Sequence, residues 1–125
     1  MTQEDKELLL IDLCARLPYG VKCKYYDYCE GDYNEGTICG FERQEYIQID
    51  GVCIHIEDIK PYLFPLSSIT DEQMDEYDNL KQDIIDKLKD WKCAKLLDWL
   101  NKNHFDYRSL NPKGLAIDCT NLNIY

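Results

Sequence analysis

The sequence predicts a single α+β domain over residues 1–125, with an N-terminal helix, a small antiparallel sheet or SH3-like barrel, and C-terminal helices packed on it. Two observations predict this class. Apolar residues recur at helical spacing near the N-terminus, alternate with polar residues over 21–56, and return to helical spacing over 70–103. A chain of 125 residues with 45% hydrophobic residues can bury one core without disulfides or metals.

The first expected element is an amphipathic helix over residues 4–17. Acidic side chains near its start favour the helix dipole. Pro18 and Gly20 end it, because proline disfavours a helical residue before it and glycine suits the reversal that follows. Its apolar face consists of Leu8, Leu9, Ile11, Leu13, Cys14 and Leu17.

Residues 21–56 are expected to form four or five short antiparallel strands, because apolar and polar residues alternate there. The pair Asp50-Gly51 predicts a hairpin, since a type I′ turn needs positive φ at both central positions. A looser reversal is expected over residues 27–36. Many short strands in so short a stretch suggest a curled sheet or an SH3-sized barrel.

A second helical region is expected to start at Thr70. Thr70 and Gln73 form a capping box, in which each side chain hydrogen-bonds the backbone amide of the other residue. A helical break is expected near residues 90–92, and Leu115–Asp118 could add an edge strand. The apolar face that should pack on the sheet and the next helix consists of Met74, Tyr77, Leu80, Ile84, Leu88 and Trp91.

The charge of the chain argues against several kinds of partner. The net charge is −10, with about −6 in residues 26–50 and about −5 in residues 71–90 by counting. Since proteins bind nucleic acids by neutralising phosphates with Lys and Arg, we expect no nucleic-acid partner and no anionic membrane surface. No apolar run reaches the ~20 residues of a membrane-spanning helix, and the N-terminus lacks a secretory signal. We therefore expect a cytoplasmic protein.

The seven cysteines are an odd number without an export signal, which favours reduced thiols over a disulfide framework. Cys23, Cys29, Cys39 and Cys53 could supply thiolates to a zinc ion, but no two of them form the close pair that such sites use. A simpler interpretation makes Cys23, Cys39 and Cys53 small core residues. We expect no metal ion and no cofactor.

A cysteine nucleophile with His55 or His104 as its base is the one catalytic arrangement left open. No spacing locates such a pair. His55 lies in an expected strand, on the face opposite its two isoleucine neighbours, and His104 follows a helix whose last carbonyls it could contact. Glycine-rich phosphate loops are absent from the sequence. We therefore expect that the chain is not an enzyme.

Two surfaces are candidates for binding a protein partner. Exposed tyrosines on a small barrel commonly form grooves for proline-rich or extended peptides, although strands also favour tyrosine simply to cover a thin core. An acidic helix could mimic a phosphate backbone and occupy a basic DNA-binding surface, or could only aid solubility. The candidate partner-binding residues are Tyr25, Tyr26, Tyr28, Tyr33, Asp75, Glu76, Asp83 and Asp86.

Three sequence blocks, Leu8–Val21, Ile59–Thr70 and Asp98–Arg108 with Gly114–Ala116 after it, carry a resemblance. Together they resemble a family of small uncharacterised proteins found in Bacteroides-type gut bacteria and their prophages. The blocks lie in order and span most of the chain. The resemblance implies a bacterial or phage cytoplasm, and it implies no activity, cofactor or site residue.

The expected function is that of a non-enzymatic accessory protein of a bacterial prophage or mobile element, acting by contact with an unidentified protein partner. Two alternatives stay open: a zinc- or thiol-dependent protein that uses the cysteines, and an acidic mimic of nucleic acid. The oligomeric state is left open as well.

Overall fold

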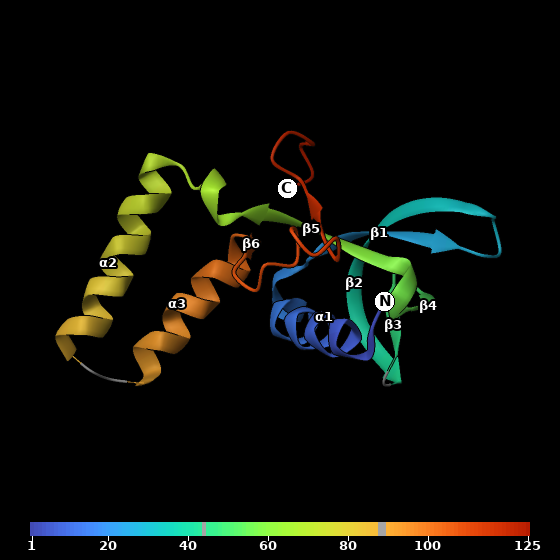
Figure 1. Cartoon of the computed structure of the whole chain (residues 1–125), viewed down its shortest axis with the longest axis horizontal. Coiled ribbons are helices and arrows are strands. Elements are labelled where there is room, and N and C mark those ends of the chain that lie inside the picture. Colours follow the sequence, from blue (N-terminus) through green and yellow to red (C-terminus); the bar gives the residue numbers. More distant parts are fainter. Residues whose placement is uncertain (44, 88–89) are drawn as a thin grey trace.

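The computed structural model describes the backbone of residues 1–43, 45–87 and 90–125, and the side chains of residues 1–43, 45–82 and 95–125. It is an α+β fold with an N-terminal helix, an open and mostly antiparallel sheet, and a pair of helices (Figure 1). The helices are α1 (Gln3–Arg16), α2 (Asp71–Lys87) and α3 (Asp90–Lys102), with short 3-10 turns η1 (Leu17–Tyr19), η2 (Ile56–Asp58) and η3 (Leu66–Ser68). The strands are β1 (Lys22–Asp27), β2 (Asp32–Arg43), β3 (Tyr46–Ile49), β4 (Val52–His55), β5 (Ile59–Pro65), β6 (Phe105–Asp106) and β7 (Ile117–Asp118).

The first helix, α1, begins and ends close to where the sequence predicts. Thr2 caps it, because its hydroxyl accepts a hydrogen bond from the amide of Asp5 at 3.1 Å. After η1 the chain reverses at Gly20, whose φ of 66° is in the left-handed region. Leu9 and Leu13 are fully buried, but Ile11 is 57% exposed. The apolar face is narrower than expected because charged residues, described below, fill part of the buried stripe.

The sheet has the strand order β4-β3-β2-β1-β5-β6, and β7 pairs with β5 beside this path. The pairs from β4 to β5 are antiparallel, whereas β6 and β7 run parallel to β5. Asp50 and Gly51 have φ values of 48° and 86° and join β3 to β4, so the predicted hairpin is confirmed. The predicted edge strand within Leu115–Asp118 is confirmed as β7.

The sheet curls around the core but does not close. No strand pairing of the described residues joins β4 at one end of the path to β6 at the other. The small antiparallel sheet is therefore the alternative that the structure supports, and the SH3-like barrel is not confirmed. Along β1, Cys23 and Tyr25 point into the core with Leu9 and Leu13 of α1, while Lys24 points to the outer face.

The helices α2 and α3 extend away from the sheet as a pair (Figure 1). The predicted capping box starts α2, with Thr70 and Gln73 exchanging hydrogen bonds of 3.0 and 3.2 Å. α3 returns to the sheet at β6, where the ring of Trp99 stacks on Phe105 with centroids 5.6 Å apart.

The apolar face of α2 was expected to pack on the sheet and on the next helix. The contact with the next helix is confirmed, since the rings of Tyr77 and Trp99 lie against each other, whereas α2 stands away from the sheet (Figure 1). The predicted division into two helices near residues 90–92 is confirmed, since α2 ends at Lys87 and α3 begins at Asp90. The side chains of Ile84, Leu88 and Trp91 lie outside the described residues. Among the helices in the described ranges, none combines the length and apolar composition needed to cross a bilayer.

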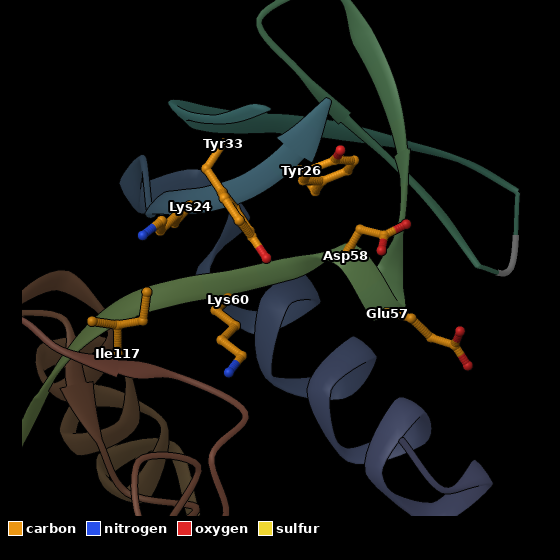
Figure 2. Close-up of a pocket in the computed structure, with 7 residues that line it drawn as sticks. All are labelled: Lys24, Tyr26, Tyr33, Glu57, Asp58, Lys60 and Ile117. Atoms are coloured by element: carbon orange, nitrogen blue, oxygen red, sulfur yellow. The ribbon is translucent and has the colours of Figure 1, made fainter. Parts of the chain in front are cut away.

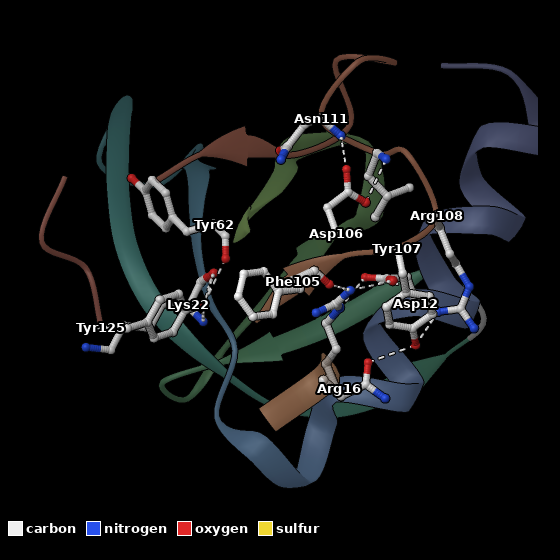
Figure 3. A network of polar contacts seen from close by, with 12 residues as sticks. Asp12, Arg16, Lys22, Tyr62, Phe105, Asp106, Tyr107, Arg108, Asn111 and Tyr125 are labelled. Carbon is white, nitrogen blue, oxygen red and sulfur yellow. Dashed lines mark hydrogen bonds and ion pairs between the residues drawn. The ribbon is translucent and has the colours of Figure 1, made fainter. Parts of the chain in front are cut away.

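A buried polar network ties α1 to the chain after α3 (Figure 3). The guanidinium of Arg16 donates to both carboxylate oxygens of Asp12, at 2.7 and 3.1 Å, and to the carbonyl of Phe105 at 2.6 Å. Arg108 donates to the same carboxylate at 3.1 Å. Asp106 accepts the amides of Leu110 and Asn111, both at 2.9 Å. This network holds α1 against the segment that follows α3.

Candidate functional site

The turn between β1 and β2 presents the tyrosines of the hairpin. Asp27 is buried and its carboxylate accepts the amide of Cys29 at 2.9 Å, while its carbonyl accepts the amide of Gly31 at 2.7 Å. Gly31 closes the turn with a φ of 71°. Asp27, Cys29 and Gly31 thus fix the backbone on both sides of Tyr28, a turn residue whose side chain is 72% exposed.

Tyr26, Tyr28 and Tyr33 form one aromatic cluster, the tyrosine surface, on the outer face of the hairpin. Tyr26 and Tyr33 are direct partners across β1 and β2, with ring centroids 5.1 Å apart. Tyr28 lies two residues from Tyr26 on the same face, with its ring 4.8 Å away. Both contacts are edge-to-face, an arrangement that the charge distribution of aromatic rings favours.

Polar contacts hold the tyrosine surface in place. The hydroxyl of Tyr28 donates to the carboxylate of Asp58 at 3.1 Å, which raises the pKa of that hydroxyl and keeps it protonated. The ammonium of Lys24 lies 5.0 Å from the ring centre of Tyr33. Tyr33 is nevertheless 59% exposed. The cluster is therefore an ordered surface with its aromatic area open to solvent.

A shallow hollow of about 280 Å³ lies between the tyrosine surface and β5 (Figure 2). It is lined by Lys24, Tyr26, Tyr33, Glu57, Asp58, Lys60 and Ile117. Figure 2 shows the two tyrosines on the hairpin side and Asp58 and Lys60 on the β5 side. At this size the hollow holds one or two side chains of a partner rather than a drug-sized ligand.

The other predicted partner-binding residues do not join this surface. Tyr25 is 7% exposed and belongs to the core, so its prediction as a partner-binding residue is corrected. Asp75 and Glu76 are exposed on α2, at the opposite end of the long axis from the hairpin (Figure 1). Glu76 accepts the indole N–H of Trp99 at 2.8 Å. The side chains of Asp83 and Asp86 lie outside the described residues.

The four candidate zinc ligands are not brought together. Cys23 is buried, and burial, helped by the charge of Asp50, raises its pKa to about 12. Cys29 is exposed in the hairpin turn. Within the described residues, no three His, Cys, Asp or Glu side chains gather in a way that could hold a metal ion.

Two cysteines expected in the core are on the surface instead. Cys39 and Cys53 are exposed because Ile38 and Ile54, their neighbours in the alternating pattern, take the inward positions. The thiol of Cys53 donates to the carboxylate of Glu42 at 2.5 Å, and this hydrogen bond raises its pKa. A thiol held protonated in this way is a weak nucleophile and a weak metal ligand.

The two histidines have structural contacts. The Nε2 of His55 lies 3.0 Å from the carboxylate of Glu45, and its Nδ1 accepts the amide of Glu57 at 3.2 Å. The ring of His104 stacks on Tyr125 with centroids 3.6 Å apart, instead of contacting the last carbonyls of α3. No hydrogen bond between a thiol and an imidazole is found in the part of the chain that the structure describes.

The residues around the hollow that the sequence predictions missed are Lys24, Glu57, Asp58, Lys60 and Ile117. The outward position of Lys24 follows from the alternation in β1, and this signal was available. The position of Asp58 and Lys60 beside Lys24 could not be predicted from the sequence, because it depends on β5 pairing with β1 across more than thirty intervening residues. Comparison of the chain with protein-family models, with curated protein sequences and with solved structures finds no match.

Proposed function

We propose that this chain is a non-enzymatic accessory protein that acts by binding a partner protein at the tyrosine surface. The observation that carries the proposal is the exposure of Tyr28 and Tyr33 within an ordered aromatic cluster at the end of a fixed hairpin. Tyrosine is enriched at protein interfaces, because its ring supplies contact area at a low cost in conformational entropy. The resemblance of three sequence blocks supports a role in the cytoplasm of a bacterium, encoded by a prophage or mobile element.

The test is an affinity capture from lysate of a Bacteroides-type host with three tagged versions of the chain. The variant Tyr28→Ser with Tyr33→Ser removes the exposed rings, and Tyr46→Ser is the matched control, since Tyr46 is an exposed strand tyrosine outside the cluster. We expect the wild type and the control to retain one stoichiometric protein that the double variant loses. Equal capture of that protein by all three versions, or its recovery in a control capture without the tagged chain, would contradict the proposal.

A second proposal, the acidic mimic of nucleic acid, draws support from the position of α2. Its carboxylates at Asp71, Asp75 and Asp78 are exposed on a helix that stands away from the sheet. This proposal predicts that a basic DNA-binding protein is captured, and that Asp75→Asn with Asp78→Asn abolishes the capture. Because α2 and the hairpin lie far apart, the two sets of variants separate the two proposals.

A further inference from the structure

Lys24 and Lys60 stand side by side, and within the described residues neither forms an ion pair. They are register partners in the antiparallel pair β1–β5, and both are exposed on the outer face. Like charges directly opposite each other on neighbouring strands destabilise a sheet. The arrangement is notable in a chain with 24 acidic residues and only 14 basic ones. We refer to these two residues as the lysine pair.

The carboxylates near the lysine pair are bound to other groups. Glu35, the register partner of Lys24 on β2, accepts the hydroxyl of Tyr62 at 2.7 Å. Asp58 accepts the hydroxyl of Tyr28, and Glu57 forms an ion pair of 2.8 Å with Lys6. Within the described residues, neither ammonium of the lysine pair has a carboxylate within ion-pair distance.

We propose that the hollow binds an extended acidic peptide segment, with a carboxylate of the segment between Lys24 and Lys60 and its neighbouring side chains against Tyr26 and Tyr33. This inference rests on the proposed function and names the chemistry of the partner. Charge complementarity supports this inference. The two ammonium groups, which form no ion pair, attract a carboxylate of the peptide, and the tyrosine rings beside them offer an apolar contact to its neighbouring side chains. Its small volume of about 280 Å³ suits side chains of an extended segment.

The sheet restricts how such a segment binds. β1 is paired with β2 on one side and with β5 on the other, and further along β5 pairs with β7, at Tyr62 and Leu63, and with β6, at Phe64 and Pro65. Lys24 therefore lies on a strand that is paired on both sides, where a peptide cannot add as a further strand. Recognition therefore comes from the side chains on the outer face, and it depends on the lysine pair.

The direct test is an NMR titration of the full chain with a peptide of about twelve alternating Glu and Pro residues, which is extended because such sequences form polyproline II. The comparison peptide has Gln in place of Glu. We expect saturable shifts of the backbone amides around the hollow with the Glu peptide, weakening as salt is added, and none with the Gln peptide. Absence of saturation up to millimolar peptide, or equal binding of the Gln peptide, would overturn the inference.

Protein variants make the test specific to the lysine pair. Lys24→Gln with Lys60→Gln should weaken binding about tenfold, as two exposed ion pairs of up to ~1 kcal/mol each allow. Lys102→Gln with Lys113→Gln, exposed lysines elsewhere, should bind as the wild type does. Lys60→Gln alone should leave the urea midpoint unchanged or raised, because it removes the repulsion with Lys24. A fall in that midpoint would show that the lysines are structural and would contradict the inference.

Three further measurements distinguish other occupants of the hollow from an acidic peptide, and separate failure of this inference from failure of the proposed function. Inorganic phosphate that produces the same shifts at the same concentration would show a bare anion site, and would overturn the peptide inference. Self-association in sedimentation that disappears with Asp75→Asn and Asp78→Asn would show that a second copy's α2 fills the hollow. If the lysine variant still captures the lysate partner while the tyrosine variant does not, the inference fails and the proposed function stands.

Discussion

Asp12 and Arg16 are charged residues with no solvent exposure, and this is unusual for a short helix in a small protein. Taking two charges out of water costs free energy, which their mutual attraction repays only with good geometry and further hydrogen bonds. Here the pair is bidentate, Arg16 also donates to the carbonyl of Phe105, and Arg108 adds a second cation to Asp12. The ring centre of Tyr107 lies 5.1 Å from the guanidinium of Arg16 and 4.7 Å from that of Arg108, which adds cation–π attraction.

Replacing Asp12 by Ala should therefore destabilise the fold strongly. The change leaves Arg16 buried without a counter-charge, and we expect the free energy of unfolding to fall by about 3–5 kcal/mol. Urea denaturation followed by circular dichroism measures it. Glu7→Ala, an exposed acidic residue of the same helix, should change stability by about 0.5 kcal/mol or less. A loss at Asp12 that matches the loss at Glu7 would show that the buried pair contributes little.

His104 is a second residue whose charge state depends on its surroundings. Its imidazole stacks on the ring of Tyr125, and the hydroxyl of Tyr125 accepts the amide of Lys22 at 2.8 Å and donates to the carbonyl of Tyr62 at 3.0 Å. Burial, and after it the positive charges of Arg16 and Lys22, lowers the pKa of His104 from 6.5 to about 4. The folded protein therefore keeps this ring neutral at a pH where the unfolded chain binds a proton.

This lowered pKa predicts a loss of stability in acid. Above pH 6.5 the ring is neutral in both states and has no pH effect, while between pH 6.5 and about 4 only the unfolded chain takes up the proton. We expect the urea midpoint of the wild type to fall more steeply over this window than that of His104→Asn. Asn lacks a titrating group and tolerates the left-handed φ of 61° at this position. Parallel pH curves for the two proteins would contradict the prediction.

At the scale of elements, local patterns predicted the parts of the fold that depend on few residues. The capping box at Thr70 and Gln73 and the turn at Asp50-Gly51 are formed as predicted, because each needs only the hydrogen bonds or the φ angles of adjacent residues. The alternation in β1 predicted a buried and an exposed face. Because Val21 and Cys23 share the phase of Tyr25 while Lys22 and Lys24 share that of Tyr26, the same alternation places Tyr25 on the buried face, as the structure does.

The pairing and packing of elements far apart in the sequence could not be predicted from those local patterns. β5 contains two prolines, which are uncommon within a sheet, yet it pairs with β1 and contributes Lys60 to the hollow, with Asp58 just before it in η2. Similarly, an apolar helix face predicts that something covers it; the sheet and the next helix were both expected to cover α2, and the structure places α3 against it. The tyrosines of the candidate site were predicted from local composition, whereas the lysine pair depends on tertiary pairing and required the structure.

At the scale of the whole molecule, charge is spread along the long axis. The stretch from residue 71 to residue 90 carries about −5 by counting, and it forms most of α2 at one end, whereas the lysine pair lies towards the hairpin at the other. Residues 26–50, which include the hairpin, also carry about −6, so the lysine pair is a local cationic site in an otherwise negative molecule. An acidic segment is attracted there only at short range, once it lies beside the two ammonium groups.

The same charge distribution predicts that salt stabilises the fold. With a net charge of −10, repulsion between carboxylates favours expansion, and raising ionic strength from about 0.01 to 0.15 M shortens the screening length from about 30 to 8 Å. Screening also weakens exposed ion pairs such as Lys6 with Glu57, but the buried Asp12–Arg16 pair is protected from it. We expect repulsion to dominate, so that the melting temperature rises by about 4 °C for each kcal/mol relieved.

Variants decide whether α2 is the source of this effect. Asp75→Asn with Asp78→Asn makes the net charge two units less negative and removes a like-charged pair one helical turn apart. Its melting temperature should be higher at low salt and should rise less as salt is added. Lys113→Gln makes the net charge one unit more negative, so its melting temperature should rise more with added salt than that of the wild type. A melting temperature that falls with salt in the wild type would mean that attractive surface pairs, rather than the repulsion along α2, control stability.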